Sequence, residues 1–173
     1  MRTYIRSKAA GGVYFFTVNL AERHNNDLLI SHVDLLREAF RLTKRQYPFI
    51  IEACVILPEH LHCIWRLPEG DYDFSTRWRL IKTHFSKNIA LNERISNSRK
   101  WKKERGIWQR RFWEHLIKDE EDYKNHIDYI HYNPVKHGYV QQAIDWQYSS
   151  FHLWIERGVY PRDWAIQQDM ELG

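Results

Sequence analysis

The sequence predicts an α+β protein in which helices pack on a mostly antiparallel β-sheet. Short segments with alternating or continuous apolar residues predict strands, whereas longer segments with apolar residues three or four apart predict helices. Turn-forming residues separate these segments. The predicted order is strand, helix, strand, strand, helix, strand, helix, which calls for one layered domain.

The first two elements are a strand and a helix. Residues 13–19 follow a pair of glycines and are rich in β-branched and aromatic residues, which predicts a strand. A helix is expected next, with Ser31 as its cap and Asp34 three residues further on. Its apolar positions continue on one face to about Gln46.

Two strands follow in close succession. Residues 49–57 form an almost continuous apolar run, which predicts a strand buried on both faces. Residues 60–67 alternate, so His60 and His62 are expected on the same face of the next strand. If Pro58 begins a two-residue turn, the two strands pair as a hairpin.

Ser75 is the expected cap of a second helix, because apolar residues at helical spacing follow it. Arg77, Lys87 and part of Lys82 are expected on its solvent side. Residues 92–105 are polar and predict a mobile loop. Residues 112–118 then predict another strand.

Asp119 is the expected cap of the last main helix, whose first turn is acidic, as the helix dipole favours. Asn133 is expected near its end, because Pro134 disfavours helical geometry in the preceding residue. At 100° per residue, Tyr129 and Asn133 lie beside the apolar face of this helix. The helix therefore holds Tyr129, His126 and Asn133 over an adjoining cleft.

This order of elements resembles a ferredoxin-like fold. The chain has 173 residues, which suits one well-packed domain. We expect that domain to span residues 1–140. Residues 141–173 are expected to form an aromatic-rich tail that docks on it.

Charge and aromatic content favour a nucleic-acid partner. The formal net charge is +4, and the chain has eight Trp, ten Tyr and eight Phe. Cations and aromatics interleave between residues 100 and 113, a mixture that suits phosphate contact and base stacking. The alternative interpretation of this segment is a solvated loop beside core aromatics.

We expect no secretory leader, because the basic first residues lack the apolar stretch of one, and no apolar run is long enough to span a membrane. Cys54 and Cys63 face each other if the predicted hairpin forms, and a disulfide there is a second interpretation. Two cysteines without a leader favour free thiols in a reducing cytoplasm. We expect a cytoplasmic monomer, with a dimer as the alternative.

His60 and His62 are candidate metal ligands. Two imidazoles alone make an incomplete site, because catalytic metals usually have three protein ligands. Asn133 is a candidate for the third ligand through its amide oxygen. Such a site, completed by substrate phosphate, suits Mg²⁺ or Mn²⁺, and Zn²⁺ is compatible with it. The alternative is that both histidines are simply packed or exposed.

Tyr129 is a candidate nucleophile, and the alternative is a core tyrosine whose hydroxyl is hydrogen-bonded. A phenol with a pKa of about 10 is a poor nucleophile at neutral pH. A metal bound to the phosphate offsets this by polarising the electrophile and neutralising developing charge. His126 is then a candidate to orient the phenol or accept its proton, or else an ordinary surface histidine.

Three motifs in this order resemble the REP-associated tyrosine transposases, a group of HUH single-strand nucleases. The motifs are VILPEHLHCIW (55–65), WQRRFWEH (108–115) and DYIHYNPVKHG (128–138). The resemblance runs from residue 11 to about residue 161. It implies that His60 and His62 are the metal ligands and that Tyr129 is the nucleophile. Asn133 stands where related insertion-sequence enzymes use glutamine.

The resemblance implies metal-dependent nicking and joining of single-stranded DNA at REP hairpins, through a 5′-phosphotyrosine intermediate. The expected partner is a REP hairpin with a single-stranded flank. A silent hairpin-binding protein and a water-using metal phosphodiesterase are the alternatives. Seven residues are candidate DNA contacts: Arg2, Arg6, Lys82, Trp108, Arg110, Arg111 and Lys136.

Overall fold

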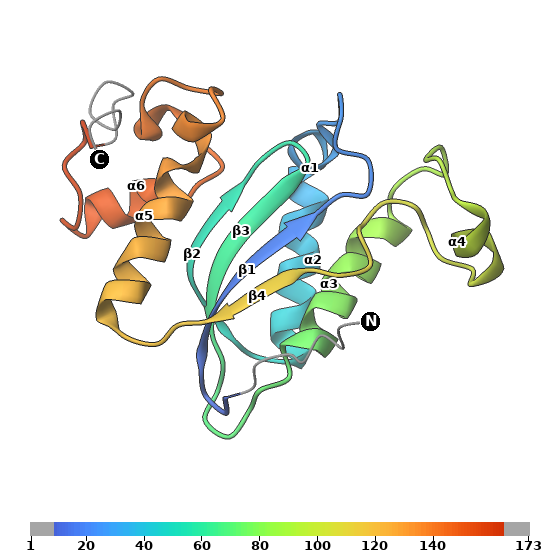
Figure 1. The fold of residues 1–173 in the computed structure, drawn as a ribbon, viewed down its shortest axis with the longest axis horizontal. Helices are drawn as coiled ribbons and strands as arrows, with labels where there is room; N and C mark the ends of the chain where they lie inside the picture. Colours follow the sequence, from blue (N-terminus) through green and yellow to red (C-terminus); the bar gives the residue numbers. More distant parts are fainter. Residues whose placement is uncertain (1–8, 165–173) are drawn as a thin grey trace, which may run out of the picture.

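The computed structural model describes residues 9–164 of the chain (Figure 1). The strands are β1 (Val13–Asn19), β2 (Ile50–Ile56), β3 (His60–Arg66) and β4 (Trp113–Leu116). The helices are α1 (Leu28–Ser31), α2 (Val33–Gln46), α3 (Phe74–Lys87), α4 (Asn97–Trp101), α5 (Glu120–Lys136), the 3₁₀ helix η1 (Ala143–Asp145) and α6 (Phe151–Glu156).

The four strands form one sheet in the order β2-β3-β1-β4, and every neighbouring pair is antiparallel. In this order β1 and β2 are parallel but separated by β3, which is the split arrangement of a ferredoxin-like fold. The prediction of an α+β protein with a mostly antiparallel sheet is therefore confirmed. Pairing of β1 with β4 brings the first and last strands of the sheet together.

Helices cover both faces of the sheet. Helices α2 and α3 lie behind it in Figure 1, and α5 lies on the opposite side. Along β1, Tyr14 and Phe16 belong to the core under α2 and α3, whereas Phe15 belongs to the core under α5. Trp65 on β3 stacks on Trp78 of α3 with ring centroids 4.3 Å apart. Alternation along the strands thus feeds two separate apolar cores.

The turn between β2 and β3 has the predicted register, with Cys54 paired with Cys63. Both cysteines are free thiols. The prediction that β2 is buried on both faces is wrong, because β2 is an edge strand with several half-buried residues. β3 is the strand buried on both faces, from His60 to Trp65. A central strand is covered from both sides, whereas an edge strand is not.

Three predicted helix features differ from the structure. Ser31 ends α1 instead of capping α2, which begins at Val33. Asp73, two residues before the predicted cap, caps α3 by accepting the Thr76 N–H. The polar loop contains α4, whose cap is Ser96. Short polar side chains two or three residues apart compete for the same cap, so spacing alone does not choose among them.

The predicted cap of α5 is confirmed, since the Asp119 carboxylate accepts the Asp122 N–H at 2.8 Å. The helix continues past Asn133, however, and Pro134 lies inside its last turn. Proline costs the helix one hydrogen bond, to the Ile130 carbonyl. Among residues 9–164, no helix has the length and apolar character that crossing a bilayer requires.

Arg77 is buried, which contradicts the prediction that it faces solvent. Its guanidinium donates to both oxygens of Asp71, at 2.8 and 3.1 Å. It also donates to the backbone carbonyls of Tyr47, Pro48 and Asp73. One arginine therefore joins the start of α3 to the end of α2.

We expect Arg77→Ala to lower the free energy of unfolding by about 3–5 kcal/mol. The substitution strands the Asp71 carboxylate and three carbonyls that the buried guanidinium now satisfies. Urea unfolding followed by circular dichroism measures the loss. Arg79→Ala is the matched control, because Arg79 is exposed on the same helix, and its effect should stay within about 0.5 kcal/mol. Equal losses in the two variants would contradict this account.

Candidate active site

His60 and His62 lie side by side on the face of β3 that α5 covers. Their ring centroids are 4.9 Å apart. The Tyr129 ring, from α5, meets the His62 ring edge-on at 5.2 Å. Both histidines are buried and Tyr129 is half-buried. The structure therefore brings together the two predicted metal ligands and the predicted nucleophile.

Neighbouring side chains hold both histidines by the Nδ1 atom. Nδ1 of His60 lies 2.7 Å from the Glu59 carboxylate, which Arg23 also contacts at 3.0 Å. Nδ1 of His62 lies 2.8 Å from the Thr17 hydroxyl. A proton on Nδ1 that is shared with an oxygen leaves Nε2 as the nitrogen with a free lone pair. Supporting bonds of this kind orient metal-ligating histidines.

Burial keeps the imidazoles neutral. Burial, together with smaller contributions from the nearby His60 and His137, lowers the pKa of His62 to about 3. Burial also lowers the pKa of His60, although Glu59 opposes this effect. A metal binds the neutral imidazole, so these histidines need lose no proton at neutral pH.

His137 is a site residue that the sequence prediction missed. Its ring lies 5.3 Å from the His60 ring, and burial lowers its pKa. Tyr129, Asn133 and His137 follow one another at intervals of four residues. They therefore form one stripe along α5 and its C-terminal cap. The signal was present in the sequence as a repeat of this spacing.

Asn133 lies between Tyr129 and His137 on this stripe and has no solvent exposure. Neither polar atom of its amide has a hydrogen-bond partner among residues 9–164. An unsatisfied buried amide is costly, and a bound cation is one way to satisfy its oxygen. Two oriented imidazoles supply part of the ligand set of a divalent metal, and the unpartnered Asn133 amide on the neighbouring helix is a candidate for a further ligand.

Lys136 lies over the Tyr129 ring, with Nζ 4.8 Å from the centroid. A cation there is placed to contact a phosphate that approaches the phenol. His126 does not contact the paired histidines directly. Its ring packs on Phe15 at 4.7 Å, and Phe15 in turn contacts both His62 and Tyr129.

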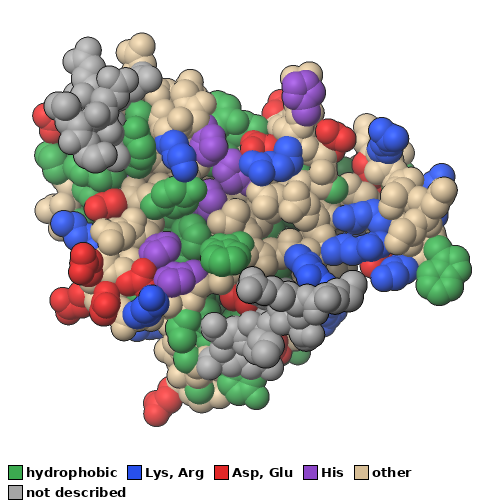
Figure 2. All heavy atoms as spheres, viewed as in Figure 1, with side chains coloured by type: hydrophobic (Ala, Val, Ile, Leu, Met, Phe, Trp, Pro, Cys, Tyr) green, Lys and Arg blue, Asp and Glu red, His purple; other side chains and the backbone are tan. Residues whose placement is uncertain are grey.

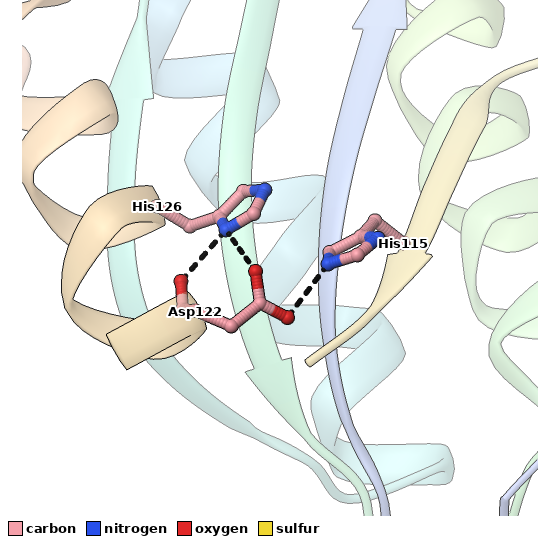
Figure 3. Close-up of side chains that lie close together, drawn as sticks. All are labelled: His115, Asp122 and His126. Carbon is pink, nitrogen blue, oxygen red and sulfur yellow. Dashed lines mark hydrogen bonds and ion pairs between the residues drawn. The ribbon is translucent and has the colours of Figure 1, made fainter. Parts of the chain in front are cut away.

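His126 belongs instead to a second group of polar side chains, shown in Figure 3. Asp122 sits between His115 of β4 and His126 of α5, and its carboxylate contacts both rings. The ligand atoms of these three residues lie within 4.8 Å of one another, close enough to hold a metal ion. Of these three residues, only His126 was a predicted site residue, because the approach of His115 and Asp122 to it depends on the fold.

A cationic groove of about 780 Å³ lies between α3 and the segment that carries α4. Figure 2 shows Lys and Arg side chains gathered on this side of the molecule, and histidines in two groups beside α5. Glu104 is the one acidic residue of the groove lining. The basic residues that line it are Arg79, Lys82, Lys87, Arg99, Lys103, Arg105 and Arg110.

The predicted DNA contacts lie in different settings. Lys82 donates to the Gln109 carbonyl, and Arg110 pairs with Glu104, both in the groove. Arg111 is exposed beyond the groove, whereas Trp108 is buried and packs on Phe85. The exposed tryptophans of the described segment are Trp101 and Trp113. Arg2 and Arg6 lie outside the described residues.

A buried polar network joins α5 to the C-terminal segment. The Tyr160 hydroxyl donates to Asp128 at 2.6 Å, and His131 bonds to Ser150 at 2.8 Å. Ser150 also accepts the backbone N–H of Cys54, on β2. The network therefore fixes the helix that carries Tyr129 against the sheet that carries the paired histidines.

This network predicts a loss of stability in acid. Burial lowers the pKa of His131 to about 3, whereas an unfolded histidine has a pKa of about 6.5. The unfolded chain thus binds more protons in this window, and stability falls as pH drops below 6.5. Between pH 7 and pH 4.5, we expect the free energy of unfolding to fall by about 2–3 kcal/mol less in His131→Gln than in the parent. Urea unfolding at the two pH values measures the difference.

The exposed His24 offers the control for that experiment. His24→Gln should retain the full pH dependence of the parent. An identical pH dependence in the His131 variant would show that this histidine is not buried in its neutral form.

Two paired histidines on a four-stranded antiparallel sheet, with a tyrosine on the helix that covers them, define the single-tyrosine HUH class of proteins. No protein-family model matches the chain. It is 50% identical over 165 residues to a REP-associated tyrosine transposase of Escherichia coli, covering 95% of this chain and 92% of the relative. It is 44% identical to a putative REP-associated tyrosine transposase of Haemophilus influenzae, covering 99% and 98%.

A solved structure of a REP-associated tyrosine transposase bound to a REP hairpin matches with a TM-score of 0.81 and 48% identity. The match covers 95% of this chain and 92% of that one. The chain therefore belongs to the REP-associated tyrosine transposases, a family of DNA-processing enzymes.

Proposed function

We propose that this protein nicks and rejoins single-stranded DNA beside REP hairpins, with Tyr129 as the nucleophile. The observation that carries the proposal is the edge-on contact of Tyr129 with His62, one of two oriented, neutral histidines. His60 and His62 would hold a divalent metal, Mg²⁺ or Mn²⁺, through Nε2, and Asn133 would supply an amide oxygen. When bound, the metal polarises the scissile phosphate and neutralises its developing charge.

The chain's own groups define the transfer step. The Tyr129 oxygen attacks phosphorus, the P–O3′ bond breaks, and a 5′-phosphotyrosine forms. The Tyr129 hydroxyl gives its proton to water as it attacks, and O3′ of the departing strand takes a proton from water to become a free 3′-OH. A second 3′-OH reverses the step and regenerates the tyrosine, so joining needs no energy source. Lys136, over the Tyr129 ring, contacts the phosphate at this position.

The cationic groove is the expected binding surface for the DNA backbone. Gln109 is one of the residues that line the groove. Its backbone N–H donates to the carbonyl of Asn19, the last residue of β1. Asn19 is the strand partner of His60. A backbone held along the groove therefore continues toward the end of the sheet that carries His60. Lys and Arg contacts of this type supply most of the affinity for DNA and weaken with salt.

All the proposed catalytic groups come from one chain, which supports action as a monomer. We propose that residues 1–140 form the nuclease domain and that residues 141–173 dock on it; residues 165–173 lie outside the described part of the chain. Phe151 is fully buried there, and the Trp146 indole donates to the Ile56 carbonyl. These contacts support the expectation that the tail docks on the nuclease domain.

A labelled REP hairpin with a single-stranded flank tests the proposal. With Mg²⁺ or Mn²⁺, a protein–DNA adduct that survives denaturant should form, together with a free 3′-OH, and a chelator should prevent both. Tight binding without cleavage would instead identify a silent hairpin-binding protein. Cleavage without an adduct would identify a water-using phosphodiesterase.

A further inference from the structure

Three side chains converge at the start of α5, away from the paired histidines. Nε2 of His115 lies 2.8 Å from one carboxylate oxygen of Asp122, and Nδ1 of His126 lies 3.1 Å from the other. In Figure 3 both nitrogens point at the carboxylate between them. The side chains are each about one-fifth exposed, at 25%, 18% and 24%. Three metal-ligating side chains thus lie within 4.8 Å of one another at a place that solvent partly reaches.

Asp122 is held in its ionised form. Burial opposes ionisation, but the Lys118 N–H and the two histidines outweigh it and keep the pKa of Asp122 below its usual range. The Lys118 N–H donates to the Asp122 carboxylate at 2.9 Å. The carboxylate is therefore a preformed anionic ligand whose position is fixed before any ion binds.

Two imidazoles and one carboxylate are a ligand set for a first-row transition ion such as Zn²⁺. Metal–ligand bonds of about 2.0–2.2 Å put neighbouring ligand atoms roughly 3–3.5 Å apart in a tetrahedral site. The two imidazole nitrogens now lie 2.8 and 3.1 Å from different oxygens of Asp122, and all the ligand atoms lie within 4.8 Å, so an ion is held once these hydrogen bonds open and the side chains adjust around it. Binding displaces the protons now shared with Asp122, and the Nδ1 bond of His126 to the Asp122 carbonyl is lost.

We propose that His115, Asp122 and His126 form a second metal site, which takes Zn²⁺ or Co²⁺ and is separate from the Mg²⁺ or Mn²⁺ site. The Phe15 ring separates the two groups, because it packs on His126 at 4.7 Å and on His62 at 5.6 Å. The ion ties β4 to the first two turns of α5. It therefore fixes the helix on which Tyr129 lies one turn further along.

Cobalt(II) binding tests this site independently of DNA cleavage. The parent protein should bind two Co²⁺ ions by calorimetry, with visible absorption typical of tetrahedral coordination. His60→Ala/His62→Ala should retain one ion. Adding His115→Gln and His126→Gln to that double variant should abolish the retained site or weaken it at least about tenfold. Zn²⁺ should raise the melting temperature of the double variant and leave the quadruple variant unchanged.

His24→Gln/His152→Gln, added to the same double variant, removes two histidines outside both groups and should leave Co²⁺ binding unchanged. Circular dichroism without metal checks that each variant is folded. The proposal is overturned if the double variant binds no Co²⁺, or if its ion survives loss of His115 and His126. The adduct assay in Mg²⁺ reports on Tyr129 separately, so the nuclease proposal and this one fail by different results.

Discussion

Tyr129→Phe should reduce the yield of the covalent protein–DNA adduct by at least about a thousandfold. The substitution removes only the hydroxyl oxygen, which is the atom proposed to attack phosphorus. The ring remains, so its contacts with His62 and Phe15 persist and the fold is retained. Denaturing gel analysis of a labelled hairpin measures the adduct, and a filter-binding assay of the same samples measures affinity, which should stay within about twofold.

Tyr132→Phe is the matched control, because Tyr132 is half-buried on the same helix and three residues further along. It should form the adduct at the rate of the parent. An undiminished adduct in the Tyr129 variant, or its loss only in the Tyr132 variant, would refute the assignment of the nucleophile. Cleavage that persists without an adduct would favour a water nucleophile.

Removing the paired histidines should have the second large effect. We expect His60→Ala/His62→Ala to lower Mg²⁺-dependent cleavage on the order of a thousandfold, because polarisation of the phosphate is lost. Mn²⁺ binding, followed by electron paramagnetic resonance, should weaken in parallel. A variant that binds DNA normally but neither binds Mn²⁺ nor cleaves would place the metal at these residues.

Thr17→Val sharpens this test, since it leaves both imidazoles in place. It removes the hydroxyl that orients His62 at 2.8 Å. Loss of such a supporting group typically weakens metal binding 10- to 100-fold. His24→Ala serves as the control, because His24 is exposed. Equal Mn²⁺ affinity in the parent and in both site variants would show that the metal does not bind at His60 and His62.

Much of the site was predictable because its spacings are local. Residues two apart on a strand lie on the same face, and this rule placed His60 and His62 together. Residues four apart on a helix also lie on the same face, and this rule placed Tyr129 and Asn133 together. Asp119 was predictable as a cap because capping involves only the first turn of the helix. These rules need no knowledge of what lies across the sheet.

Several missed features depend on partners that are distant in sequence. Arg77 looked like a surface cation until the end of α2 supplied carbonyls around it. Strand β2 looked central until the sheet order placed it at an edge. Burial is decided by the elements that pack on a residue, and periodicity within one segment does not specify them.

The sequence alone therefore determined the α+β class, the order of strands and helices, and the pairs that carry the proposed chemistry. Only the tertiary structure decided which pairs meet. It set Tyr129 against His62, brought His137 to His60, buried the amide of Asn133 and joined His115 to Asp122 and His126. The reason is physical: local hydrogen-bonding periods fix the direction of each side chain, whereas packing of α5 on the sheet fixes its neighbours.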